Sequence, residues 1–135
     1  METLSIATRR REEIVDITDL VQQHLATQKA SNGLVYLMVM HTTAALTTAD
    51  LDPGTDLDML AAFRAMIPRL KFRHPHDPAH VPDHILSSLI GPAVVVPFAS
   101  GSLVLGTWQR IVLVEFDGPR ARMITVSLIT PAASS

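Results

Sequence analysis

Histidines are the side chains of this sequence best suited to do chemistry, because four of the six fall between positions 74 and 84, at 74, 76, 80 and 84. Neutral imidazole is the commonest nitrogen ligand for zinc and related transition metals. The sequence has no cysteine to complete a structural zinc site. Three histidines with water or substrate in the remaining position, as in an open catalytic site, would be the natural form. The alternative is a polar surface loop whose histidines cap turns and bind water.

The segment around these histidines is predicted to be a structured loop followed by a short helix. Prolines at 75, 78 and 82 remove backbone donors, so neither a helix nor a central strand is expected before Pro82. From there apolar residues recur at helical spacing up to Gly91, with Asp83 as the expected N-cap and Gly91 as the stop. His84 would lie in the first turn, facing the loop.

A further histidine, His41, follows an apolar run from Gly33 to Met40. A continuous apolar run of this length predicts a strand buried on both faces. Such a strand would deliver His41, Thr42 and Thr43 at the edge of the core, where a rigid element positions their side chains. We therefore include the two threonines as candidates for hydrogen bonds to ligand oxygens.

Four aspartates crowd the next turn, at positions 50, 52, 56 and 58. Acidic residues are favoured at turns and in the first turn of a helix, which accounts for three of them. Asp50 differs because it directly follows the His41 segment. It is the candidate catalytic carboxylate, which would orient a ligand or move a proton.

The remaining patterns predict an α+β fold with a largely antiparallel sheet and packed helices, in a single domain spanning residues 1–135. Three elements are expected before the loop that contains His74, His76 and His80. They are an opening strand at Leu4 and Ile6, a helix from Asp16 or Thr18, and another helix from Thr55 or Asp56. Strands are expected at 93–98, 102–105, 111–116 and 123–129, joined by tight turns at 99–101 and 117–120.

Residues 106–109 interrupt the strand pattern. Gly106 suggests a bulge or a close approach of the backbone. For Trp108 two interpretations stay open, filling of core volume or contact with a ligand. Gln109, if buried, would need hydrogen-bonding partners and would support the site from behind.

Composition limits the classes of function. Of the 135 residues 47% are hydrophobic and 18% charged, and the net charge is −2. This balance argues against a nucleic-acid or membrane-surface binder, and such a low charged fraction favours association between copies. With no cysteine, no signal peptide and only strand-length apolar runs, the expected location is the cytoplasm.

Several motifs resemble one protein family. They are His41-Thr-Thr-Ala-Ala-Leu-Thr47, the acidic turn 50–58, His74, His84-Ile-Leu-Ser-Ser-Leu-Ile-Gly91, Gly101-x-Leu-x-Leu-Gly-Thr-Trp-Gln109 and Asp117-Gly-Pro-Arg120. Together they resemble the YjbQ-like family, also labelled secondary thiamine-phosphate synthase enzymes. The resemblance covers nearly the whole chain, and the Leu-Gly-Thr-Trp-Gln block is its most specific part.

The resemblance implies a compact α+β fold and a homotrimer. It also implies that His41, His74 and His84 gather into a metal- or anion-binding pocket, with zinc as the expected divalent metal and magnesium as an alternative during turnover. The implied reaction joins a hydroxymethylpyrimidine diphosphate to a thiazole phosphate. Thr107 and Gln109, in the most specific block, are then candidates for binding substrate.

Two functions follow as hypotheses. The first is a metal-dependent enzyme acting on a small phosphorylated substrate, in which three histidines hold the cation while Thr42, Thr43 and Arg73 bind oxygens. The second is a non-catalytic oligomeric module that binds a metal ion or an anionic metabolite. Both need the same pocket, and the sequence does not separate them.

Overall fold

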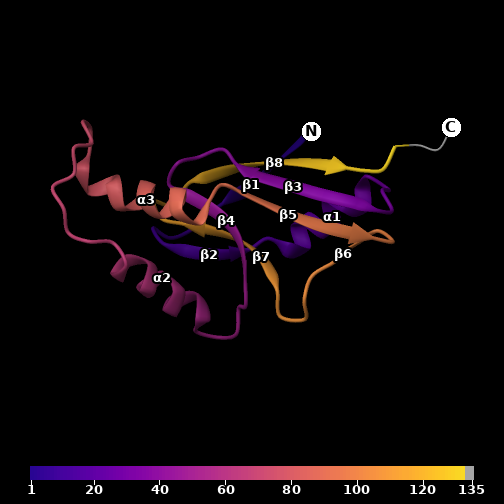
Figure 1. Ribbon diagram of the computed structural model, residues 1–135, viewed down its shortest axis with the longest axis horizontal. Helices are drawn as coiled ribbons and strands as arrows, with labels where there is room; N and C mark the ends of the chain where they lie inside the picture. Colours follow the sequence, from indigo (N-terminus) through magenta and orange to yellow (C-terminus); the bar gives the residue numbers. More distant parts are fainter. Residues whose placement is uncertain (133–135) are drawn as a thin grey trace.

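The computed structural model describes residues 1–132 and confirms the α+β fold, with two antiparallel sheets (Figure 1). The five-stranded sheet has the order β1 (Glu2–Ala7), β8 (Ala121–Ile129), β3 (Gly33–Val39), β5 (Ala93–Ala99), β6 (Ser102–Leu103). The three-stranded sheet has the order β2 (Glu13–Asp16), β7 (Arg110–Glu115), β4 (Ala44–Ala49). The helices are α1 (Thr18–Thr27), α2 (Thr55–Ala65), a 3-10 turn at Pro78–His80 and α3 (Val81–Ile90).

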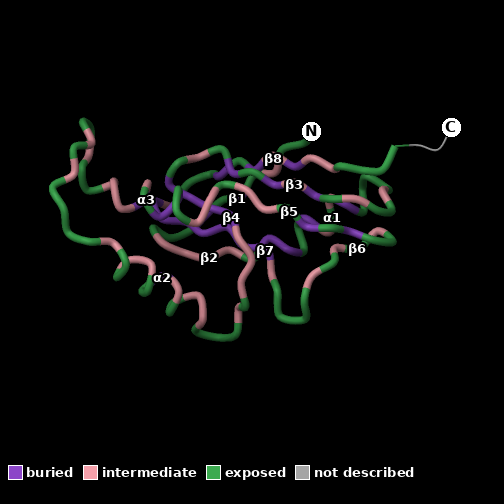
Figure 2. Tube along the Cα trace, in the orientation of Figure 1, coloured by how far each residue is buried: buried purple, intermediate pink, exposed green. Residues whose placement is uncertain are grey.

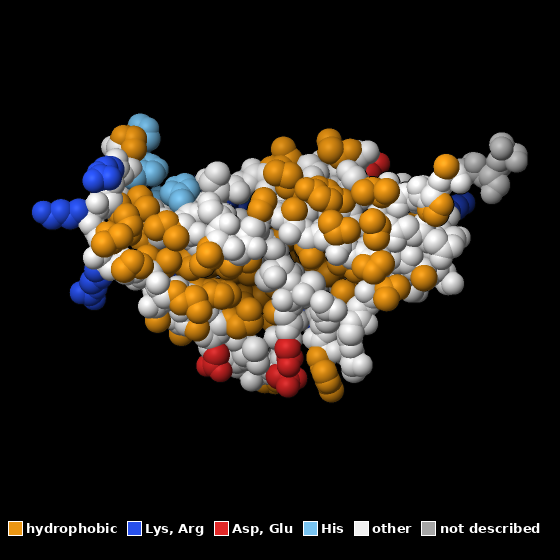
Figure 3. All heavy atoms as spheres, viewed as in Figure 1, with side chains coloured by type: hydrophobic (Ala, Val, Ile, Leu, Met, Phe, Trp, Pro, Cys, Tyr) orange, Lys and Arg blue, Asp and Glu red, His pale blue; other side chains and the backbone are white. Residues whose placement is uncertain are grey.

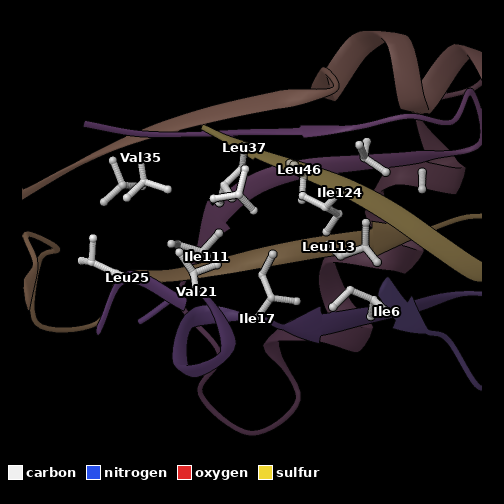
Figure 4. Packing of buried hydrophobic residues seen from close by; sticks show 14 of the residues in the cluster. Ile6, Ile17, Val21, Leu25, Val35, Leu37, Leu46, Ile111, Leu113 and Ile124 are labelled. Carbon is white, nitrogen blue, oxygen red and sulfur yellow. The ribbon is translucent and has the colours of Figure 1, made fainter. Parts of the chain in front are cut away.

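The two sheets face each other across the main hydrophobic core (Figure 4). Inward side chains of the five-stranded sheet, such as Leu37 and Ile124, pack with Leu46 and Leu113 of the three-stranded sheet. Helix α1 closes one end of this core with a buried apolar stripe that includes Val21. The strands thus alternate inward and outward residues, as half-buried antiparallel sheets do.

A second, smaller core lies on the other side of the three-stranded sheet. Leu60 of α2 and Leu86 of α3 pack there against Val112, Val114 and Phe116. Strand β7 is therefore covered on both faces, by the five-stranded sheet on one side and by the helices on the other, and its residues from Ile111 to Glu115 are all buried (Figure 2).

The expectation that the strand at 33–40 is buried on both faces is wrong. Alternate side chains of β3 are buried, but Leu34 and Met38 point to the open face of the five-stranded sheet and are exposed. No helix covers that face within residues 1–132, so the apolar residues of β3 that point to it are exposed. Because both faces of the strand carry apolar residues, periodicity alone cannot distinguish it from a strand buried on both faces. The doubly buried strand is β7.

The predicted start of the last helix also needs correction. Helix α3 begins at Val81, so Pro82 lies in its first turn, where a missing backbone N–H leaves no hydrogen bond unmade. Asp83 is inside the helix and fully buried rather than at the N-cap. Gly91 ends the helix as predicted, with a φ of 105° that favours glycine.

The turn at 117–120 does not join a hairpin, contrary to the expectation. Strand β7 pairs with β2 and β4, whereas β8 pairs with β1 and β3, so this turn carries the chain from one sheet to the other. The hairpin predicted between β5 and β6 is present, with Phe98 opposite Leu103. None of the helices over residues 1–132 has the length and apolar content to span a bilayer.

Shortening a core side chain of β7 should destabilise the fold strongly. Leu113 is fully buried between the two sheets, so Leu113→Ala removes apolar contacts and leaves a cavity. We expect the free energy of unfolding in urea to fall by about 2–5 kcal/mol. Leu57→Ala, at an exposed position of α2, is the control and should change it by less than about 0.5 kcal/mol. Equal effects of the two substitutions would contradict the placement of the core.

Candidate functional site

The histidine loop and helix α3 bring two of the predicted ligands together. The imidazole rings of His74 and His84 are stacked, with centroids 5.3 Å apart and planes inclined by 13°. His84 lies in the first turn of α3 because the helix begins at Val81, so its ring points back over the loop that precedes the helix. The sequence prediction that His84 faces this loop is confirmed.

A backbone carbonyl fixes the proton of His84. Its Nδ1 lies 3.1 Å from the carbonyl oxygen of Thr42. A carbonyl only accepts hydrogen bonds, so Nδ1 carries a hydrogen and the neutral ring has its lone pair on Nε2. This contact also places the His41 segment beside α3, although His84 and Thr42 are 42 residues apart along the chain.

A backbone amide fixes the hydrogen-bonding role of His41, and here the contacted ring nitrogen is an acceptor. The amide of Met123 donates to His41 Nε2 at 2.9 Å, so the hydrogen of the neutral ring is on Nδ1. Partial burial lowers the pKa of His41, and the nearby guanidinium groups of Arg122 and Arg120 lower it further, against a smaller opposite effect of Glu115. His41 therefore favours the neutral form, with an N–H free at Nδ1.

His74 is fixed by its own loop. The amides of His76 and Asp77 donate to its Nδ1 at 3.3 and 3.1 Å, which leaves the hydrogen on Nε2. His74 and His41 therefore each have their lone pair engaged by backbone amides. The ring nitrogen that remains free on each of them is a hydrogen-bond donor.

A cavity of about 350 Å³ opens next to His41. The hydroxyl-bearing residues Thr42, Ser87 and Ser88 line it together with His41. Its other walls are apolar and consist of Met38, Val39, Met40 and Pro92. Ser88 also lines a neighbouring open pocket that contains His84, so the two pockets adjoin at this residue.

The predicted convergence of three histidines is therefore present only in part. His74 and His84 stack, and His41 lies one residue from the carbonyl that His84 binds. The ligand nitrogens of these three do not all lie within 4.8 Å of one another. Within residues 1–132, the group that meets this distance is instead His80 with Asp83 and Asp117.

That second group is neutralised by arginines. Arg64 contacts Asp83 at 2.7 Å, and Arg11 lies 3.4 Å from Asp83 and 3.6 Å from Asp117. Arg120 pairs with Asp117 as well, at 3.0 Å. Because cations already occupy the carboxylates, this cluster is an ion-pair network that ties α2 and α3 to the turn after β7.

A buried ion pair supports the His41 segment from beneath. Nε of Arg122 donates to both carboxylate oxygens of Glu115 at 2.9 and 3.1 Å, and Nη2 binds the same carboxylate. Nη2 of Arg122 also donates to the carbonyl oxygen of Thr43 at 3.1 Å and to its hydroxyl at 2.8 Å. Both side chains of the pair are essentially inaccessible to solvent.

Thr43, a candidate for binding ligand oxygens, is buried and does not line the cavity beside His41. Its hydroxyl and its carbonyl both accept from Arg122. Contact of Thr43 with a ligand stays a prediction. Sequence reasoning missed Arg122. The available signal was a charged residue at an inward position of β8, in step with Ile124 and Val126.

The other predicted site residues lie elsewhere on the surface. Asp50, Thr107 and Gln109 line a separate cavity of about 440 Å³ with Trp108. Asp50 accepts from the amide of Asp52 at 2.9 Å, as a turn aspartate does. Gln109 is exposed, so the condition under which it would support the site from behind is not met. Arg73 is exposed on the histidine loop.

Comparisons with known proteins agree on one family. A family model described as UPF0047 protein YjbQ-like matches residues 2–131. A UPF0047 protein of Archaeoglobus fulgidus is 39% identical over 127 residues, covering 93% of this chain and 98% of that protein. YugU of Bacillus subtilis is 35% identical over 130 residues, covering 96% and 98%. A crystal structure of a YbjQ-like protein of unknown function from Sulfolobus solfataricus superimposes with a TM-score of 0.87 at 35% identity, covering 94% of each chain.

Removing the buried carboxylate should weaken the fold in a pH-dependent way. Burial raises the pKa of Glu115, but hydrogen bonds from Arg122, Thr8 and the amide of Asp117 outweigh it and hold this pKa below its ordinary value. A lowered pKa in the folded state contributes stability above the unfolded value of about 4.3, and this contribution is lost as the pH falls through the folded value. Glu115→Gln should lower the free energy of unfolding by about 3–5 kcal/mol at pH 7 and by less at pH 3.

Urea unfolding at pH 7 and at pH 3 measures this difference. The control is Glu2→Gln, at an exposed position of β1, which should leave the unfolding free energy nearly unchanged. A loss of stability for Glu115→Gln that is equal at both pH values would contradict the role assigned to the carboxylate.

Proposed function

The chain belongs to the YjbQ-like UPF0047 family, and on that premise we propose that it is a non-catalytic homotrimeric module that binds a small anionic or phosphorylated ligand at His41, His74 and His84. The observation that carries this proposal is the fixed protonation of the imidazoles. His41 and His74 each accept backbone amides through one ring nitrogen, so the free nitrogen of each ring donates. Two fixed donors, one on His41 beside the cavity and one on the His74 ring that stacks on His84, suit a ligand rich in acceptor oxygens.

Neighbouring groups extend this donor set. Thr42 is exposed, and its hydroxyl and that of Ser88 line the same cavity as His41. His84 joins the set when it is protonated, since its Nδ1 already donates to Thr42 and its Nε2 then carries a second hydrogen. The exposed Arg73, next to His74 in the chain, adds a positive charge to the loop. Phosphate and sulfate oxygens are the usual partners of such a set.

The same hydrogen bonds fit a three-histidine zinc site poorly. A metal ion needs the lone pair of each imidazole, and the lone pairs of His41 and His74 are engaged by amides. His84 alone has the arrangement of a metal ligand, with Nδ1–H on a carbonyl and a free lone pair on Nε2. Zinc or another divalent metal bound by all three histidines stays a prediction, and the hydrogen bonds favour an anion.

Catalysis by this chain also stays a prediction. Asp50, the candidate catalytic carboxylate, lines a cavity with Trp108 and Gln109 and does not line the one that contains His41. Within residues 1–132 no acidic side chain lines the cavity that contains His41, so binding is the activity best supported by the residues there. A phosphorylated ligand of the kind implied by thiamine-phosphate synthesis belongs to the class of anion that we propose.

The proposed homotrimer has support from an uncovered apolar surface. The outer face of the five-stranded sheet exposes Leu34, Met38, Val95, Met123 and Ile129. Strand pairing puts Leu34 directly opposite Ile129, and all five residues lie on the adjoining strands β3, β5 and β8. Figure 3 shows hydrophobic side chains spread over the face of the molecule that carries β3, β5 and α3. Patches of this kind mark surfaces that associate.

Sulfate affinity, measured by calorimetry as a function of pH, tests the proposed ligand class. Sulfate keeps its charge between pH 8 and pH 6, whereas imidazole gains a proton near pH ~6.5, so sulfate should bind more tightly as the pH falls. His84→Ala should weaken sulfate binding at pH 6 by at least about tenfold, the size of one charge-assisted hydrogen bond.

The control is His76→Ala, which removes an exposed imidazole of the same loop but keeps the amide that His74 accepts. It should leave sulfate affinity nearly unchanged. A zinc site would behave in the opposite way, because protons compete with the metal for imidazole. Zn²⁺ binding that weakens on acidification, together with no binding of sulfate, would refute the proposal.

A further inference from the structure

Trp108, the one tryptophan of the sequence, is 69% exposed. It lies in the connection between β6 and β7, which projects from the body of the molecule apart from α3 (Figure 1). The sequence left open whether this side chain fills the core or contacts a ligand, and its exposure excludes the core. An indole this exposed to water leaves a large apolar area uncovered.

The loop that holds Trp108 is ordered by hydrogen bonds. Oε1 of Gln109 accepts from the amide of Gly106 at 3.1 Å, and its Nε2 donates to the hydroxyl of Thr48 at 3.0 Å. The amide of Gln109 also donates to the carbonyl of Gly106 at 3.1 Å. Gln109 thus fixes the loop to β4 and holds the indole outward. A rigid, exposed aromatic side chain is the usual form of an interface anchor.

A receiving surface of matching character lies at the other end of the molecule. An open pocket of about 450 Å³ is lined by His84, Ile85, Ser88 and Leu89. Leu89 is 68% exposed although it lies in a helix of a folded chain. This pocket shares Ser88 with the cavity beside His41, which Met38 also lines. The apolar lining suits an indole.

The charges of the two surfaces are complementary. The cavity beneath Trp108 is bordered by Asp16, Asp50 and Asp52, with Arg110 as the one basic residue among its lining. The loop that carries His74 contains three exposed basic residues, Arg69, Lys71 and Arg73. Figure 3 shows Lys, Arg and His side chains at the end of the molecule near α2 and α3, and Asp and Glu side chains on a different edge. Complementary charge orients the two surfaces toward each other.

We propose that Trp108 of one copy inserts into the pocket formed by His84, Ser88 and Leu89 of a second copy. The inserted side chain and the pocket are different surfaces of the same chain, so the contact is head-to-tail, which is the type of contact that a cyclic trimer uses. The proposal rests on the proposed function for the assembly and for the anion site. The partner's indole would cover that site, exclude water and strengthen the hydrogen bonds from the imidazoles.

Tryptophan fluorescence tests this contact directly, because Trp108 is the one tryptophan of the chain. In the wild-type assembly the emission maximum should be at shorter wavelength than in the monomer, and dilution to the monomer should shift it to longer wavelength. Leu89→Asp, which leaves Trp108 untouched but charges the pocket, should show the long-wavelength emission at all concentrations. The control Leu57→Asp, at another exposed leucine on α2, should behave like the wild type.

Light scattering on Trp108→Ala gives a second readout. We expect the dissociation constant of the assembly to rise by at least about 30-fold, the effect of an interface hot spot. Three results would each overturn the proposal. The first is an assembled wild-type protein with long-wavelength emission, the second is a wild type that is monomeric at all concentrations, and the third is a Leu89→Asp variant that matches the wild type. Sulfate binding that depends on His84 in a protein whose Trp108 stays exposed would refute this contact while leaving the anion site intact.

Discussion

The buried pair of Glu115 and Arg122 is the interaction on which the rest of the structure depends. Glu115 ends β7 in the three-stranded sheet, and Arg122 begins β8 in the five-stranded sheet, so their hydrogen bonds join the two sheets at one end of the core. A buried ion pair offsets the cost of removing its two charges from water only when the other hydrogen-bonding groups of both side chains also have partners. Thr8 supplies one to Glu115 at 2.7 Å, and Thr43 takes two from Arg122.

This pair connects the fold to the candidate site. Arg122 holds Thr43, and the adjacent Thr42 carbonyl accepts from His84, so the guanidinium indirectly sets the distance between the His41 segment and α3. The neighbouring Met123 amide fixes the ring of His41. The same guanidinium helps to keep His41 neutral. The fixed N–H group of His41 therefore depends on this buried ion pair, whereas that of His74 is set by its own loop. Both favour an anion over a metal ion as the ligand.

Much of the fold could be predicted from the sequence, because periodicity and turn residues are local signals. The helix that ends at Gly91 and the hairpin of β5 and β6 are examples. The failures involve distant partners. The apolar run at 33–40 predicts a strand buried on both faces, because the sequence does not show that one face of its sheet is uncovered. Asp83 looks like a cap because its partner Arg64, 19 residues earlier, is invisible locally.

In the candidate site, too, the features set by local sequence could be predicted and those set by distant residues could not. The clustering of His74 and His84 follows from a short loop and a helix start, and it could be predicted. The protonation of His41 could not, because it is set by an amide 82 residues away in the chain. The expectation that Asp50 lies with the His41 segment fails because the length of β4 separates the two, and Asp50 lines a cavity with Trp108 instead.

Long-range proton–nitrogen NMR correlation of the imidazole rings at pH 8 tests the central claim most directly, since it identifies which nitrogen of each neutral ring carries the hydrogen. The account predicts hydrogen on Nδ1 of His41, on Nε2 of His74 and on Nδ1 of His84. Adding sulfate should then shift the Nδ1 resonance of His41 and the Nε2 resonance of His74. Hydrogen on the opposite nitrogen of His41 and His74 would expose two lone pairs beside that of His84 and would contradict the assignment of an anion site.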